Sequence, residues 1–192
     1  MKDEQQKPGP SRATICECGG ELRPTKFDVY DFSAYVGFNV TVSGADGFKC
    51  TKCGGETIDG SLLNAVMIHT IVQISKSRRR LNGDEARYLR HTLHVTQKEL
   101  AEKMGIVRET VAKWECGDAE ISPQQDFILR ALSLGWMEAE NLITREYMSE
   151  VLRTVFTEVR IEPPKQGTSI ALSDPAAMMR DMAPRRELRA AG

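Results

Sequence analysis

The sequence predicts an α+β protein that is mainly α-helical, with a small β module followed by an all-α domain. Three observations lead to this prediction. Two closely spaced cysteine pairs flank strand-like sequence between residues 14 and 60. Apolar residues recur at helical spacing from residue 61 onward. Helix caps and a glycine turn follow one another between residues 95 and 117. At 192 residues, the chain can hold two small domains.

The charge of the chain is unevenly distributed. The net charge is -1, but residues 78–117 carry nine Lys or Arg against six Asp or Glu, a net of +3. A locally basic segment on an otherwise acidic chain favours contact with phosphates, although an ordinary solvated surface has the same composition.

The ends of the chain and its longest apolar stretch indicate a cytoplasmic protein with no membrane contact. Residues 1–13 are polar, contain two prolines and are expected to form a disordered leader rather than a secretory signal. The apolar stretch at residues 62–74 is too short to span a bilayer. In a cytoplasmic compartment thiols stay reduced, so paired cysteines point to metal more often than to disulfides.

The cysteine pairs are Cys16 with Cys18 and Cys50 with Cys53, and each pair is followed by Gly-Gly-Glu. Four thiolates on two matching turns suit a structural zinc ion in tetrahedral geometry, which would stabilise a module too small to fold on its own core. Two disulfides, four free thiols or a redox sensor are the alternatives. A catalytic zinc is not expected, because four cysteine ligands leave no open position for water.

Strand-like alternation lies between the pairs, at residues 27–32 and 38–42, and a turn signal follows at residues 43–47. Residues 14–60 are therefore assigned to a zinc-binding β module. Ser61 is expected to cap a helix that runs to about Lys76. The connecting helix and a basic linker together occupy residues 61–83.

Residues 84–136 are predicted to form a compact helical domain. Thr96 and Glu99 have the spacing of a capping box at the start of a helix. Gly105 suits a left-handed turn, after which a second helix begins near Arg108. Two short helices joined by a glycine-containing turn are typical of a helix-turn-helix. Its inner face is expected to consist of Leu100, Ala101, Met104, Val111 and Trp114.

In a helix-turn-helix the second helix enters the major groove of DNA, and its N-terminal residues contact base edges. Arg108 and Lys113 would donate to guanine or phosphate, and Glu109 would accept from cytosine. Gln97, at the start of the first helix, is placed for a phosphate contact. The predicted DNA-binding set is Gln97, Arg108, Glu109, Thr110, Ala112 and Lys113. A helical hairpin with a charged face is the alternative.

The remainder of the chain carries less information. An amphipathic helix is expected over residues 137–160, either packed in the core or used for dimerisation or partner docking. Prolines and glycines predict a disordered tail over residues 161–192. No Ser-His-Asp order, glycine-rich phosphate loop or paired-carboxylate motif stands out in the sequence, so an enzyme is not expected.

The segment from Thr96-Gln97-Lys98-Glu99-Leu100-Ala101 to Trp114-Glu115-Cys116-Gly117 resembles the Xre/Cro family of helix-turn-helix regulators, over residues 84–134. The resemblance implies a five-helix domain that binds palindromic DNA sites as a dimer. Val107 departs from the pattern, because the family often has Ser or Thr as the N-cap there.

The order of parts over residues 14–134 resembles the MqsA-type antitoxins. That resemblance implies an N-terminal structural zinc module that binds a toxin. It also implies a C-terminal domain that dimerises and represses transcription at an operator, with Glu109 and Lys113 reading bases. The one-residue gap between Cys16 and Cys18 and the long addition after Leu134 depart from that family's pattern.

The sequence therefore predicts a sequence-specific, DNA-binding transcriptional regulator, acting as a repressor through a homodimer on a palindromic operator. Two interpretations stay open: the antitoxin of a type II toxin-antitoxin pair, or a free-standing zinc-containing regulator with no toxin partner. In a third class, an RNA-associated zinc-ribbon protein, the helix pair would serve only as a protein contact.

Overall fold

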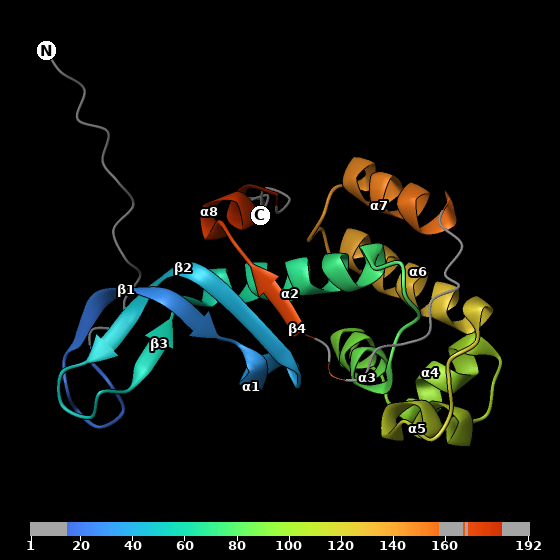
Figure 1. The fold of residues 1–192 in the computed structure, drawn as a ribbon, viewed down its shortest axis with the longest axis horizontal. Coiled ribbons are helices and arrows are strands. Elements are labelled where there is room, and N and C mark those ends of the chain that lie inside the picture. Colours follow the sequence, from blue (N-terminus) through green and yellow to red (C-terminus); the bar gives the residue numbers. More distant parts are fainter. Residues whose placement is uncertain (1–14, 158–166, 168, 182–192) are drawn as a thin grey trace, which may run out of the picture.

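The computed structural model describes residues 15–157, 167 and 169–181; the predicted leader, residues 1–13, lies outside them. The described elements are β1 (Leu22–Asp31), α1 (Ser33–Val36), β2 (Asn39–Cys50), β3 (Glu56–Ile58), α2 (Gly60–Lys76), α3 (Gly83–Thr92), α4 (Gln97–Met104), α5 (Arg108–Cys116), α6 (Pro123–Ala139), α7 (Arg145–Thr157), β4 (Ser169–Leu172) and α8 (Pro175–Asp181). The predicted α+β class is confirmed. In Figure 1 the sheet lies at one end of the long axis and α4 and α5 lie at the other.

The sheet is built around β2. β1 pairs with β2 in antiparallel register from Leu22 opposite Cys50 to Asp31 opposite Thr41. β3 pairs antiparallel with the cysteine end of β2, and β4 pairs in parallel with its other end. The turn predicted at residues 43–47 is wrong, because these residues lie inside β2. Gly44, with φ 71°, adopts its left-handed conformation within the strand, and the chain reverses at residues 32–38 instead.

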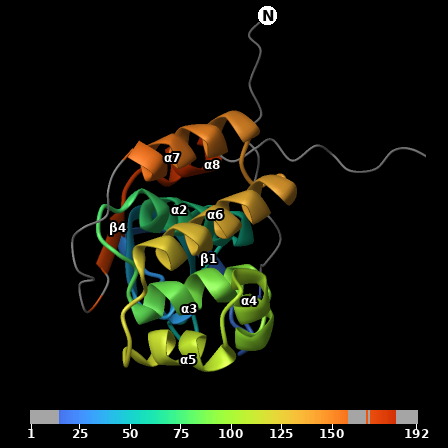
Figure 2. The same cartoon turned by 90° about the vertical axis from the view of Figure 1, so that its right-hand side faces the viewer.

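α2 runs through the middle of the molecule. Its N-cap is Asp59, whose carboxylate accepts from the Ser61 amide at 2.8 Å, so the predicted cap at Ser61 is shifted by two residues. The sequence predicts one buried stripe, but α2 is buried on most of its circumference because β4, α6, α7 and α8 all pack on it. Figure 2 shows α2 and α6 between α7 with α8 on one side and α3, α4 and α5 on the other.

The C-terminal part differs from the predicted helix and tail. α6 continues to Ala139, the chain turns at Asn141 with φ 56°, and α7 begins only at Arg145, so the helix predicted at residues 137–160 is divided between two elements. Its residues 158–160 lie outside the described residues. The tail predicted to be disordered at residues 161–192 contains β4 and α8, and its other residues apart from 167, 173 and 174 are not described.

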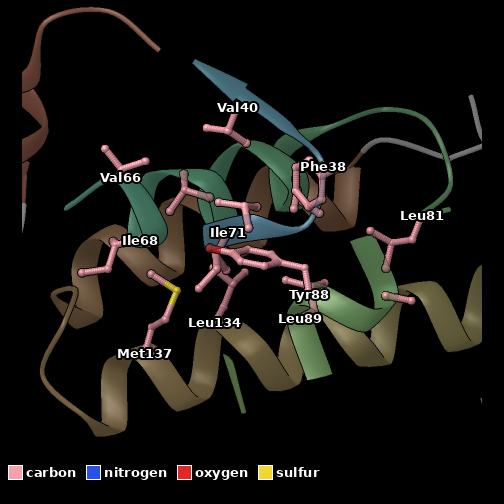
Figure 3. Packing of buried hydrophobic residues seen from close by; sticks show 14 of the residues in the cluster. Phe38, Val40, Val66, Ile68, Ile71, Leu81, Tyr88, Leu89, Leu134 and Met137 are labelled. Atoms are coloured by element: carbon pink, nitrogen blue, oxygen red, sulfur yellow. The ribbon is translucent and has the colours of Figure 1, made fainter. Parts of the chain in front are cut away.

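The hydrophobic core is continuous across these parts. Phe38 just before β2, Val40 of β2, Ile71 of α2, Leu89 of α3 and Leu134 of α6 belong to one buried cluster (Figure 3). The inner half of the β module is therefore covered by helices, whereas its cysteine end projects beyond them (Figure 1). The cysteine loops at this outer end lie outside the buried apolar cluster.

Candidate metal centre and candidate nucleic-acid interface

The four cysteines of the β module converge at one point. Cys16 and Cys18 lie in the loop before β1, Cys50 ends β2, and Cys53 lies in the turn before β3. The Sγ atoms of Cys16 and Cys53 are 3.7 Å apart, and those of Cys18 and Cys50 are 3.5 Å apart. All four sulfurs lie within 4.8 Å of one another and none forms a disulfide. The predicted ligand set is thus brought together as a cluster that can hold a metal ion.

Backbone hydrogen bonds fold the two loops alike. The Cys16 amide donates to the Gly20 carbonyl at 2.8 Å, and the Cys50 amide donates to the Gly55 carbonyl at 2.8 Å. Gly20 is required for a steric reason, because a Cβ there would lie 2.6 Å from the Cys50 sulfur. The repeated Gly-Gly-Glu therefore reflects two loops whose backbones approach the sulfurs closely.

Amide hydrogens aimed at the sulfurs favour thiolates. The Lys52 amide donates to the Cys50 Sγ and the Gly55 amide donates to the Cys53 Sγ, each at 3.4 Å. Hydrogen bonds from the backbone of Cys53 and Lys52 lower the pKa of Cys50 to about 6. At Cys18 a backbone hydrogen bond from Gly20 lowers the pKa, but hydrogen bonding with the Cys53 and Cys50 sulfurs outweighs it and raises the pKa to about 12. Without a cation, negative charge is thus favoured at Cys50 and disfavoured at Cys18.

The second candidate site is the helix pair α4–α5. The capping box of Thr96 and Glu99 is confirmed: the Glu99 amide donates to the Thr96 Oγ1 at 3.2 Å, and the Thr96 amide donates to the Glu99 carboxylate at 2.7 Å. Gly105 ends α4 in the left-handed conformation with φ 67°, and Ile106 donates to the Ala101 carbonyl at 3.0 Å. The two helices are thus joined by a turn of three residues, 105–107.

Burial divides α5 into an inner and an outer face. The inner-face prediction is confirmed for Leu100, Ala101, Val111 and Trp114, which are buried, while Met104 is half-buried. Of the predicted DNA-binding residues, Arg108, Glu109 and Lys113 are exposed, and Thr110 and Ala112 are half-buried. Because Arg108, Glu109, Ala112 and Lys113 are spaced one and four residues apart, they share the side of α5 that faces away from the core.

Gln97 has a different environment from the other five predicted DNA-binding residues. Its side-chain amide donates to the Glu115 carboxylate at 3.0 Å, so it is held against the helix pair. Arg90 of α3 donates to both oxygens of the same carboxylate, at 2.6 and 3.0 Å, and Arg87 lies 3.6 Å from it. This network joins α3, α4 and α5. The sequence analysis did not predict it, although the sequence of these helices contains many charged residues.

A second buried ion pair fixes the helical part to α2. Arg130 and Asp126 of α6 are fully buried and contact at 2.7 Å. Arg130 also donates to carbonyl oxygens at the end of α2 and in the linker, including Ser75 at 3.1 Å and Arg79 at 2.8 Å. Asp126 accepts from the Leu81 amide at 2.7 Å. The basic linker is therefore held by hydrogen bonds at Ser77, Arg79 and Leu81.

Among the described residues, none of the helices combines the length and the apolar character needed to cross a membrane. Comparison with protein families, with curated proteins and with solved structures found no match to this chain.

Proposed function

We propose that the protein is a sequence-specific DNA-binding transcriptional regulator that contacts its site with the exposed face of α5. The observation that carries the proposal is the α4–α5 pair. It consists of two short helices joined by a three-residue turn at a left-handed glycine, held from inside by Val111 and Trp114. Two short helices joined in this way support a helix-turn-helix, in which the second helix lies in the major groove.

The residue types on the outer face of α5 suit base recognition. Arg108 lies in the first turn of the helix, where side chains reach deepest into the groove, and its guanidinium can donate two hydrogen bonds to guanine. Glu109 can accept from cytosine, and Lys113 lies one turn further along, where it can bind guanine or phosphate. Repression through a homodimer on a palindromic operator is part of the proposal.

We further propose that the cysteine cluster holds a structural zinc ion. A tetrahedral ion with sulfur ligands at about 2.3 Å places the sulfurs about 3.8 Å apart, close to the 3.5 and 3.7 Å of the two facing pairs. Four thiolates fill the coordination positions of such an ion, so the zinc would stabilise the fold and would take no part in catalysis. No enzymatic activity is proposed.

The DNA-binding proposal is tested by selecting a binding site from random duplexes and measuring affinity by fluorescence anisotropy. Lys113→Ala should weaken specific binding by about 1–3 kcal/mol with the fold intact. Lys26→Ala is the matched control, because Lys26 is an exposed lysine of β1, and this strand belongs to the sheet at the other end of the molecule from α5 (Figure 1). Equal affinity of Lys113→Ala and Lys26→Ala would exclude the assigned face, and preference for RNA over duplex DNA would favour the zinc-ribbon alternative.

The antitoxin role is a second candidate, supported by the separation of the two sites. Because the sheet and the α4–α5 pair lie at opposite ends of the long axis, a partner protein could bind the module while α5 stays accessible (Figure 1). The test is co-purification from the native cells. A toxin should co-purify with both the unchanged chain and Lys113→Ala, should arrest growth when expressed alone, and should be neutralised by co-expression of the chain. Absence of such a protein leaves the free-standing regulator.

A further inference from the structure

A cavity of about 570 Å³ lies between α1, α2, α3 and the turn that connects α6 to α7. It is separate from both the cysteine cluster and the outer face of α5. Its volume falls within the range of sites that bind small organic molecules, about 300–1,000 Å³. Its floor is formed by buried side chains, and its mouth is formed by exposed ones.

The cavity has one apolar wall. Ile68 and Ile71 of α2 and Val36 of α1 are buried at its floor. Trp136, near the end of α6, lies beside them, and its ring is packed edge-on against the His94 ring with centroids 5.7 Å apart. Flat aromatic rings and branched aliphatic side chains together favour a flat, apolar ligand body.

A second wall carries hydrogen-bond donors on α3 or directly after it, and it meets the apolar wall where the His94 ring packs against Trp136. Arg87, His91 and His94 line this wall and are exposed. The acid of this wall, Asp84, lies 4.0 Å from Arg87, so the two form only a loose ion pair. A guanidinium and two imidazoles that line the same cavity favour a ligand with an acceptor group, above all a carboxylate or a sulfonate.

We propose that this cavity is a binding site for a small aromatic organic anion, with the ring system against Trp136 and the acidic group at Arg87. The apolar wall supplies affinity and the donors on α3 set the orientation, as is usual for small-molecule sites. The inference that such a ligand binds here holds whether or not the protein binds DNA.

Arg87 connects the cavity to the end of α5, because its guanidinium also donates to the main-chain carbonyl of Glu115. An anion that engages Arg87 competes with this contact, so we expect occupancy of the cavity to change the affinity of α5 for DNA. This consequence, unlike ligand binding itself, rests on the proposed function.

The test uses two fluorescent probes with the full chain in the absence of DNA. Anilinonaphthalene sulfonate is an aromatic anion, and N-phenylnaphthylamine has the same ring system without the sulfonate. We expect saturable binding of the sulfonate at one site per chain. Ala34→Trp should weaken it about tenfold or more, because residue 34 is exposed at the cavity and an indole there fills it. Ala139→Trp, an exposed position near the end of α6 outside the cavity lining, is the matched control and should bind normally.

The charge preference is tested at the two members of the loose ion pair. Arg87→Met should weaken binding of the sulfonate about tenfold but leave the neutral probe unchanged, whereas Asp84→Asn should strengthen binding of the sulfonate. Circular dichroism identifies any variant that does not fold. Probe binding that is weak, has several sites per chain, or is equal in Ala34→Trp and Ala139→Trp would overturn the proposal. DNA affinity is then measured with and without saturating sulfonate, and an unchanged value would exclude only the coupling.

Discussion

Glu115 is a buried carboxylate held by side chains from two other helices. Burial alone would raise its pKa, but hydrogen bonds from Arg90 and Gln97, together with the charges of Arg90 and Arg87, outweigh burial and lower the pKa below its ordinary value of 4.5. A carboxyl whose pKa is lowered by folding stabilises the folded protein at every pH above its unfolded value. That contribution is lost as the pH falls from about 4.5 through the folded pKa.

Glu115→Gln tests this pH dependence. At pH 7 the variant should lose about 2–3 kcal/mol of the free energy of unfolding, because Arg90 keeps a neutral partner in place of a charged one. In acid the two proteins should converge, because protonated Glu115 is as neutral as glutamine. Urea titrations at several pH values measure the difference. A difference in the free energy of unfolding between the two proteins that stays constant from pH 7 to about pH 3 would show that Glu115 is not the titrating group.

Arg130 is the other residue on which the helical part depends. Arg130→Met leaves the Asp126 carboxylate buried without its cation and removes the Arg130 hydrogen bonds to carbonyls at the end of α2. We expect a loss of about 3–5 kcal/mol in urea unfolding, since removing one partner of a buried ion pair strands the other. If the variant does not fold, Arg130→Lys should give a measurable, smaller loss.

Arg145→Met is the matched control for Arg130→Met. Arg145 also pairs with an acid of α6, Glu138 at 3.1 Å, but its side chain is 77% exposed. Solvent screens such a pair, so its loss should change the free energy of unfolding by less than about 1 kcal/mol. Equal losses in the two variants would mean that the buried pair contributes no more than a surface pair.

These two networks could not be predicted from the sequence. Arg90 and Glu115 are 25 positions apart, and Arg130 contacts carbonyls more than 50 positions away. In the sequence each looks like an ordinary charge on an amphipathic helix, and only the tertiary packing buries it. The cysteine cluster could be predicted despite its separation of over 30 positions, because matching loops with thiol pairs have few other uses.

At the scale of elements, helix ends were the most predictable features. Caps are local, so Thr96 with Glu99 and Gly105 could be assigned from spacing alone, and both assignments are confirmed. Asn82 and Ser122 form capping boxes as well, with Glu85 and Gln125.

α5 is the exception among these helices, because its N-cap residue, Val107, makes no side-chain cap hydrogen bond. Val107→Ser should stabilise the protein by about 0.5–2 kcal/mol, since a serine hydroxyl can accept from an amide of the first turn of α5. Little is lost in exchange, because Val107 is 63% exposed. Thermal unfolding measures the effect. Val29→Ser, at a residue of β1 that is 61% exposed, is the control and should give no gain.

Elements that depend on distant partners were predicted less well. β4 lies in a segment rich in Pro and Gly. Its partners in β2, Val40 and Val42, lie more than 120 positions away in the sequence. α8 is then held by packing on α2, where Met178 is buried and its carbonyl contacts the His69 Nε2 at 3.0 Å. Composition indicates only how strongly a segment tends to be disordered by itself. The contacts with β2 and α2 supply the apolar burial that this segment lacks by itself.

At the scale of the whole molecule, the two candidate sites are connected by an apolar core that does not include the cysteine cluster. Val40 and Val42 of β2, and Phe32 directly after β1, are fully buried in the cluster that includes α2. The cysteine loops lie outside this cluster, and three of the four cysteines are not buried. Metal binding should therefore stabilise the cysteine loops strongly and α4 and α5 only weakly.

Removal of the metal tests this division. A chelator, or Cys53→Ser, should release the ion and sharply increase amide hydrogen exchange in residues 15–22 and 50–56. Exchange in α2, α4 and α5 and the affinity for the selected DNA site should stay the same, because these depend on apolar packing and on the Glu115 and Arg130 networks. Cys116→Ser is the matched control: Cys116 is an exposed cysteine at the end of α5, outside the cluster, so this variant should keep one ion per chain. If the chelator instead raises exchange in α4 and α5, the core alone does not hold the helices, and the metal stabilises the whole chain rather than only the end that carries it.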